Sequence, residues 1–204
     1  MCSSDLKWTA LQAGVGSAGI VGIDGVTMAV NTVAIEVNQA ALDGTLVDFQ
    51  DATELDVVVG PDASVVFDLA DDKGEYLQVT GNAEFDFFGL VKAEAGFGVE
   101  KSSQTVTLTD GSSVQSDLLT IGLSDASAFA GYDQGTETLD DDLGLRLDDV
   151  DLALALISEQ GGTRKWTALQ AGVGSAGIVG IDGVTMAVNT VAIEVNQAAL
   201  DGTL

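Results

Sequence analysis

The residues best suited to chemistry in this chain are carboxylates that crowd together late in the sequence. The cluster comprises Asp140, Asp141, Asp142, Asp148, Asp149 and Asp151. Calcium prefers several carboxylate and carbonyl oxygens as ligands, and carboxylates so close in sequence repel one another unless a cation or water screens them. Their spacing does not match an EF-hand loop. Two interpretations therefore stay open, a calcium site and a solvated acidic loop.

Other chemistries are excluded by the residues that the sequence lacks. The chain contains no histidine, and its one cysteine is Cys2. A Ser–His–Asp or Cys–His nucleophile and a His/Cys zinc site therefore cannot be assembled. Because there are 32 acidic residues, some carboxylates will lie close together by chance, and no glycosidase is indicated. We predict a protein without enzymatic activity and without a cofactor other than calcium.

Three glycines in the sequence AGVGSAG imitate a nucleotide-binding fingerprint. Gly14, Gly16 and Gly19 have a similar spacing, but the residues after them have the pattern of a strand and a turn. A dinucleotide site needs a helix at that place. We interpret the glycines as positions where neighbouring strands approach closely.

The elements that must position these residues show a period of two. Between Leu77 and Val99, apolar or small residues alternate with mainly polar ones, which is the pattern of strands with one dry face. A single strand of that length would be unusual, so a turn is predicted at Phe88-Gly89-Leu90. The main core is predicted on the apolar face of these strands, at Phe85, Phe87 and Phe97.

The alternation changes phase at Asn31-Thr32 and at Asp148-Asp149, which predicts bulges. Asp110-Gly111 between two alternating segments predicts a hairpin. Turn signals recur about every ten residues, so one unit is expected to hold roughly ten to twelve short strands. The predicted fold class is all-β, with an antiparallel, elongated or curved sheet or sandwich built from tandem repeats.

The domain organisation follows from an internal copy. Residues 165–204 repeat residues 7–46 without a difference, at an offset of 158 residues. This indicates a tandem array in which 7–164 is one full β repeat unit and 165–204 is the first, truncated part of the next. A recent duplication and an artefact of sequence assembly both explain the identity. The short joint at 159–164 lacks a Pro/Ser/Thr-rich linker, so successive units are predicted to fuse into a continuous sheet.

The first six residues are set apart from the repeat. Residues 1–6, MCSSDL, match nothing else in the chain, and their back-translation resembles the end of a common sequencing adapter. We interpret them as a non-native leader on a reading frame of metagenomic origin. A short native leader is the alternative.

The charge of the chain narrows the choice of partners. There are 32 acidic and 7 basic residues, for a net charge of −25. Phosphates and anionic membrane surfaces would be repelled, which argues against nucleic acid as a partner. Because 46% of the residues are hydrophobic, the chain is not a disordered acidic tail. No apolar stretch reaches the roughly 18 residues of a membrane-spanning helix.

Several segments resemble the repeats of very large, acidic, repetitive bacterial surface or secreted proteins. They are FDFFGLVKAEAGFGVEKSSQTVTLTDG, SDLLTIGLSDASAFAGYD, GLRLDDVDLALALI and TALQAGVGSAGIVGIDGVTMAVNTVAIEVNQA. The resemblance implies an extracellular or cell-surface location, an adhesin-like structural role, and neighbouring repeat units as partners. It carries over no catalytic residues. A β-groove that binds lipid or another apolar ligand is the alternative function.

Overall fold

The fold is one large antiparallel sheet with a separate hairpin. A computed structural model describes residues 7–49, 55–70, 73–132 and 142–199, and these residues form strands and no helix. The strands are β1 (Thr9–Gly19), β2 (Val26–Gln39), β3 (Asp56–Gly60), β4 (Ala63–Val66), β5 (Tyr76–Phe87), β6 (Val91–Thr107), β7 (Ser113–Tyr132), β8 (Leu143–Glu159), β9 (Lys165–Val179) and β10 (Ala187–Gln197). The predicted all-β class is therefore confirmed. Among the described residues, no helix has the length and hydrophobicity needed to cross a membrane.

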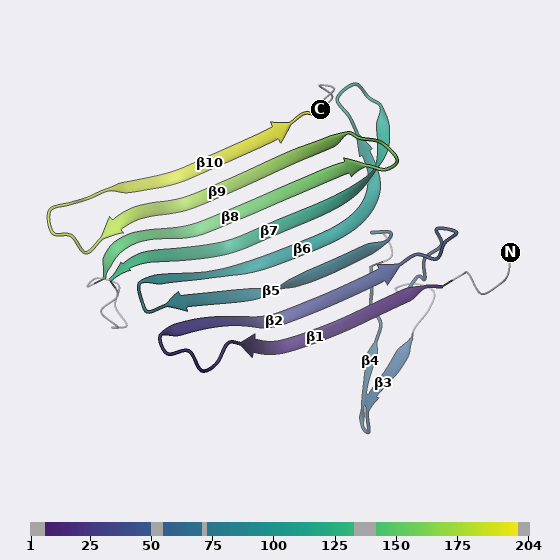
Figure 1. The fold of residues 1–204 in the computed structure, drawn as a ribbon, viewed down its shortest axis with the longest axis horizontal. Coiled ribbons are helices and arrows are strands. Elements are labelled where there is room, and N and C mark those ends of the chain that lie inside the picture. The colour runs from purple at the N-terminus through teal and green to yellow at the C-terminus, as the bar shows by residue number, and fades with distance from the viewer. Residues whose placement is uncertain (1–6, 50–54, 71–72, 133–141, 200–204) are drawn as a thin grey trace.

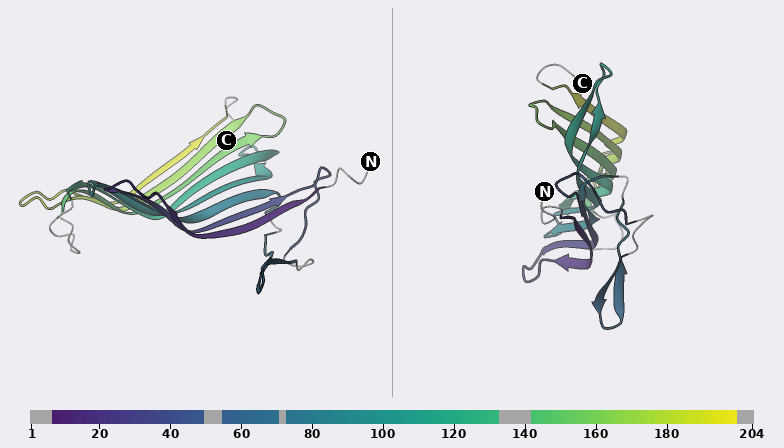
Figure 2. Two further views of the ribbon diagram at one scale, coloured as in Figure 1. Left: turned by 60° about the horizontal axis from the view of Figure 1, so that its bottom comes forward. Right: turned by 90° about the vertical axis from the view of Figure 1, so that its right-hand side faces the viewer.

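The eight-stranded sheet has the order β1-β2-β5-β6-β7-β8-β9-β10, and each strand is antiparallel to its neighbours (Figure 1). β3 and β4 lie between β2 and β5 in the chain and pair only with each other. Figure 2 shows that the sheet is a single twisted and curved layer, from which the β3–β4 hairpin projects. Of the two predicted forms, the described residues adopt the curved sheet and do not form a sandwich.

In the described part of residues 7–164, the strands are fewer and longer than the sequence predicted. The prediction of ten to twelve short strands in a unit is wrong, because β6 has 17 residues and β7 has 20. Polar positions where the alternation changes phase lie inside the strands and do not end them. Thr32, Asp125 and Asp149 have φ values of 51°, 49° and 53° inside their strands. A single residue in this conformation inverts the alternation of faces without turning the chain.

The predicted turns are confirmed. Phe88 and Gly89 have φ values of 55° and 67° between β5 and β6. At Asp110-Gly111, the Leu108 amide donates to Ser112 O over 2.8 Å and the Gly111 amide donates to Leu108 O over 3.0 Å. The predicted bulge at Asn31-Thr32 is also present, as a shift in the register between β2 and β5.

The predicted core is wrong, although its residues do share a face. Phe97 lies opposite Gly81, and Gly81 and Phe85 point to the same side of β5 by the alternation of the strand. Phe85 and Phe97 are only partly buried, and Phe87 is 45% exposed. The physical reason is that the described chain places no second layer over this face. The apolar face of the sheet therefore stands open.

Full burial is confined to small clusters outside this face. Leu108, Trp166 and Ala199 form one cluster, with Val106, Val114 and Ile157 packed against it. Leu69 and Tyr76 are 0% and 2% exposed, where the chain returns from the β3–β4 hairpin to the sheet. Phe49 and Phe67 stack with ring centroids 5.3 Å apart beside that hairpin.

Candidate functional site

The most informative site is the joint between the two identical copies, where β8 meets β9. β8 lies directly before the second copy, and β9 is the second occurrence of the sequence that forms β1. The two strands pair without a register shift from Gly144 opposite Val179 to Ser158 opposite Lys165. The sheet therefore continues from β8 across the short joint into the second copy without a break.

The turn at the joint is held by charged and polar side chains. Arg164 donates from Nε to Glu159 Oε2 over 2.9 Å and from Nη2 to Glu159 Oε1 over 2.6 Å. Gln160 donates from Nε2 to Asp117 Oδ1 over 2.7 Å, and Ser103 Oγ donates to the same oxygen over 2.8 Å. These bonds, that from Gln160 first, hold the pKa of the Asp117 carboxyl below its ordinary value. The turn is thus tied to both β6 and β7.

Trp166 shows how closely the second copy packs against the strands that precede it. It is 5% exposed and lies opposite Ile157, with the Arg164 guanidinium carbon 5.5 Å from its ring centroid. Trp8 is the same residue in the first copy, and it is 47% exposed. Its indole Nε1 donates to Thr45 O over 3.1 Å. The local sequences are identical, so the difference in exposure comes from the surroundings, which for Trp166 are Ile157 of β8 and the β6–β7 hairpin.

The lengths of the strands show the same effect. β9 has 15 residues with a neighbour on each side, whereas the same sequence in β1 forms 11 residues at the edge of the sheet. β2 has 14 residues between two neighbours, whereas its copy β10 has 11 at the opposite edge. Pairing on a second side extends a strand because the backbone groups at its ends then find partners. Neighbour contact, rather than sequence, sets these boundaries.

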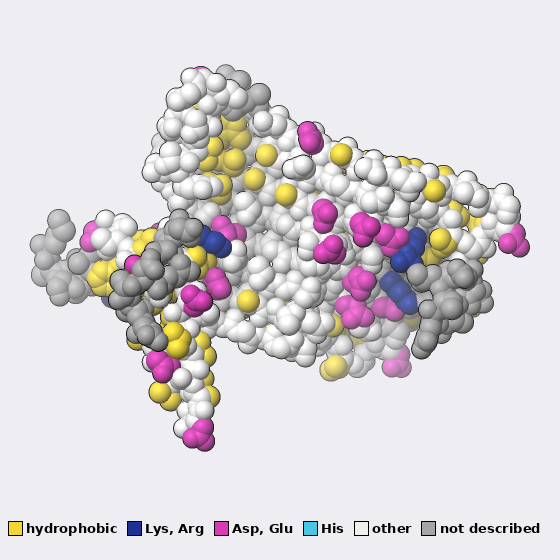
Figure 3. All heavy atoms as spheres, turned by 180° about the vertical axis from the view of Figure 1, so that it is seen from behind, with side chains coloured by type: hydrophobic (Ala, Val, Ile, Leu, Met, Phe, Trp, Pro, Cys, Tyr) yellow, Lys and Arg dark blue, Asp and Glu magenta, His cyan; other side chains and the backbone are white. Residues whose placement is uncertain are grey.

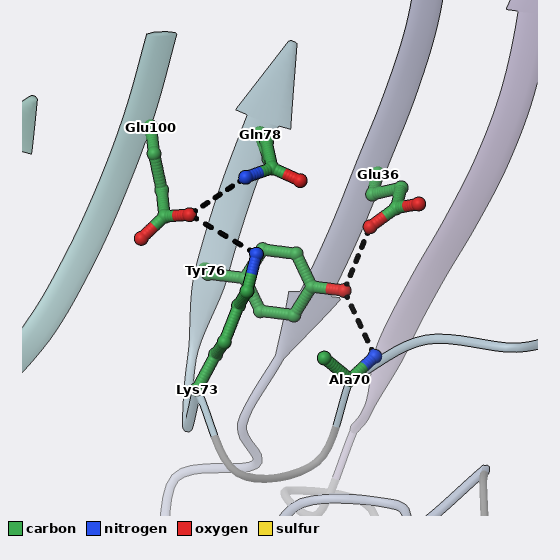
Figure 4. A network of polar contacts seen from close by, with 6 residues as sticks. All are labelled: Glu36, Ala70, Lys73, Tyr76, Gln78 and Glu100. Atoms are coloured by element: carbon green, nitrogen blue, oxygen red, sulfur yellow. Dashed lines mark hydrogen bonds and ion pairs between the residues drawn. The ribbon is translucent and has the colours of Figure 1, made fainter. Parts of the chain in front are cut away.

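A polar network holds the return from the β3–β4 hairpin against the sheet (Figure 4). The Tyr76 hydroxyl donates to Glu36 Oε2 over 3.1 Å and accepts from the Ala70 amide over 3.2 Å. Lys73 Nζ lies 3.2 Å from Glu100 Oε2 and 5.0 Å from the Tyr76 ring centroid. Burial, followed by the charge and hydrogen bond of Glu36, raises the pKa of Tyr76 to about 12. The network is structural, since it joins β2, β5 and β6 to the loop.

The residues of the predicted calcium site are only partly brought together. Asp140 and Asp141 lie outside the described residues. Asp142 is 4% exposed just before β8, and Asp148 accepts from Arg146 Nε over 2.8 Å. Asp149 occupies the bulge of β8.

Asp151 Oδ1 accepts from the Asp125 amide over 3.1 Å. The described residues include no group of three or more His, Cys, Asp or Glu side chains that could hold a metal ion. Asp140 and Asp141 of the predicted calcium site lie outside the described residues, so the calcium site stays a prediction.

The sequence analysis did not identify a second group of acidic residues, which the register of the strands brings together. Figure 3 shows Asp and Glu side chains gathered beside Lys and Arg on one face of the sheet. A hollow there is lined by Glu84, Asp86, Lys92, Glu94, Arg146 and Asp148, among others. Glu84 lies directly opposite Glu94, and Asp86 lies opposite Lys92. Both pairs are symmetric about Gly89, so the predicted turn would have revealed them.

The other sequence candidates take structural positions. Gly14, Gly16 and Gly19 lie within β1, where no helix follows them.

A groove of about 910 Å³ runs across the sheet from β5 to β10, and its lining includes Glu100, Gln170 and Glu194. None of Phe85, Phe87 and Phe97 lines this groove.

No protein family, curated protein or solved structure matches the chain.

Proposed function

We propose that the chain is a non-enzymatic structural module of a large, repetitive, extracellular bacterial protein, with an adhesin-like role at the cell surface. The observation that supports this most directly is the pairing of β8 with β9 across the boundary between the copies. The sequence that forms β1, the first strand of the sheet, occurs again as β9 and extends the sheet there. The lack of histidine and of any cysteine but Cys2 supports a role without catalysis.

The pairing at the other end supports continued growth. β10 has the sequence of β2, and the outer side of β2 pairs with β5. The outer side of β10 therefore carries the residues that accept a following copy of β5. Each unit contributes β1, β2, β5, β6, β7 and β8 to the large sheet. In the proposed array, every strand of the sheet has two neighbours except at the ends.

The register also fixes how successive units are offset. One apolar row crosses all the strands of the sheet as direct partners. It consists of Ala13, Ile35, Val79, Val99, Ile121, Leu154, Leu169 and Val195. The row starts at Ala13 in β1 but reaches Leu169 in β9, whose counterpart in the first copy is Leu11. In the proposed array, each unit is therefore displaced by two residues, about 7 Å along the strands.

The test is the shape of chains with added units. Strands lie about 4.8 Å apart, so six strands should lengthen the sheet by about 29 Å per unit before curvature is counted. We expect the maximum dimension from small-angle scattering to grow linearly as one and then two 158-residue units are appended to the chain. Inserting a flexible Gly/Ser linker between Gly161 and Gly162 provides the control. Compact particles, or scattering as flexible as that of the linker variant, would overturn the proposal.

The open apolar face favours a second candidate, a surface that binds lipid or another apolar ligand. Leu77, Phe87 and Val91 are each more than 40% exposed on this face. Contiguous exposed apolar surface commonly marks an interaction site. Mass spectrometry of organic extracts from the natively purified chain tests this candidate. Stoichiometric lipid would support it, and its absence from chains purified without detergent would exclude it.

A further inference from the structure

The open edge of β1 has a counterpart in the same molecule that shows how it pairs. Among the described residues, no strand pairs with the outer side of β1, whereas the identical sequence in β9 pairs with β8. The structure therefore contains the same strand twice, once with this edge paired and once with this edge unpaired. The paired state specifies the register and the neighbours that the unpaired one accepts.

The side chains of β1 and of Trp8 directly before it are exposed where those of β9 are covered. Trp8, Leu11 and Val15 are 47%, 45% and 40% exposed. Their counterparts Trp166, Leu169 and Val173 are buried or half-buried. The β8 residues opposite those counterparts are Ile157, Leu154 and Val150. The apolar side chains of β1 thus match those of a β8 strand one for one.

A glycine gives an independent indication of the same neighbour. A Cβ atom on Gly174 would lie 2.6 Å from the Cβ of Asp149 in β8, closer than real Cβ atoms approach. Its counterpart Gly16 has no atom within 4 Å of such a Cβ, so nothing around β1 requires a glycine there. The glycine is explained at both positions when a β8 strand lies alongside.

We infer that the outer edge of β1 is a docking site for the β8 edge of a second copy of this chain, in the register of the β8–β9 pair. The β9–β10 hairpin covers that β8 edge within its own molecule and competes with β1 of another. The hairpin therefore prevents association between chains while it covers β8. Association becomes possible when the hairpin detaches. This inference depends on the internal copy alone, and it extends to contacts between molecules.

A peptide tests the docking site on the full chain. The probe is a fluorescein-labelled peptide of residues 142–160, which contains β8 and no competing hairpin. We expect saturable binding by fluorescence anisotropy, no binding of a scrambled peptide, and at least a tenfold loss of affinity in Gly16→Val. Gly14→Val is the matched control, because a Cβ on its counterpart Gly172 would meet nothing within 4 Å. Failure of the peptide to bind, or equal binding by Gly16→Val, would overturn the inference.

A second arm tests the covering hairpin. Gly174→Val places a side chain against Asp149 and should detach β9 from β8, so this variant is expected to self-associate in sedimentation velocity. The double variant Gly16→Val with Gly174→Val should return to the monomer. Self-association that persists in the double variant would contradict the proposed edge. If Gly174→Val fails to fold by circular dichroism, the peptide binding decides.

Discussion

At the scale of single residues, Tyr76 is the group whose chemistry the fold changes most. Its pKa rises from 10.0 to about 12 because burial and the neighbouring Glu36 carboxylate disfavour the phenolate. The unfolded chain ionises first, so the stabilisation is fully present below pH 10 and is lost as the pH rises through 12. Two units of pKa correspond to about 3 kcal/mol.

We therefore expect the free energy of unfolding to fall between pH 10 and pH 12, and to fall less in Tyr76→Phe. At neutral pH this variant should be less stable by about 1–3 kcal/mol, because the Ala70 amide loses its acceptor. Urea titrations across the pH series provide the measurement. Tyr132→Phe is the matched control, since the Tyr132 side chain is 60% exposed. An equal alkaline slope in Tyr76→Phe and the wild type would contradict this account.

At the scale of elements, the two copies place one sequence in two different environments. Trp166 is packed by the β6–β7 hairpin and by Ile157, whereas Trp8 has no such neighbours among the described residues. Truncating a buried tryptophan to alanine costs roughly 3–5 kcal/mol, because the contacts are lost and a cavity remains. Truncating a half-exposed one costs far less.

We expect Trp166→Ala to destabilise the β9–β10 hairpin by about 3–5 kcal/mol and Trp8→Ala to cost at most about 1 kcal/mol. Hydrogen exchange of the amides in β9 and in β1 measures the two effects separately. Each substitution serves as the control of the other, because the local sequences are the same. Similar losses of protection at both sites would mean that the joint with β8 does not stabilise Trp166.

The same comparison explains what the sequence can and cannot predict. The turn at Phe88-Gly89-Leu90, the hairpin at Asp110-Gly111 and the bulge at Asn31-Thr32 follow from local chemistry, and all three are confirmed. Strand lengths failed because polar residues also occur inside strands: β6 continues through Lys101-Ser102-Ser103, and β7 continues through the bulge at Asp125. The core at Phe85, Phe87 and Phe97 failed because alternation identifies a face but does not say what covers it.

The site was predictable to a similar extent. The short joint at 159–164 predicted a continuous sheet, and the β8–β9 pair crosses this joint. The partners of Trp166 were not predictable, because Leu108 and Val114 reach it through long-range packing with no local pattern. Opposed Glu84 and Glu94 needed only the turn at Gly89 and the rule of antiparallel pairing.

At the scale of the whole molecule, charge opposes the fold that hydrophobic alternation favours. The chain has a net charge of −25, and carboxylates such as Glu84 and Glu94 lie directly opposite each other in its single-layer sheet. Such self-repulsion destabilises a compact state, and salt weakens it as the Debye length falls from about 30 Å at 0.01 M to about 8 Å at 0.15 M. Added salt should therefore stabilise the chain.

We expect the melting temperature to rise by several degrees when NaCl is increased from about 0.01 M to about 0.15 M, with most of the gain within that range because screening saturates. Comparing CaCl₂ with MgCl₂ and NaCl at equal ionic strength separates screening from binding. A further increase with calcium alone, lost on adding chelator and in Asp140→Asn with Asp141→Asn, would establish the calcium site predicted from the sequence. Equal increases with all three salts would leave the acidic cluster as a solvated loop, and a melting temperature that ignores salt would contradict the proposed self-repulsion.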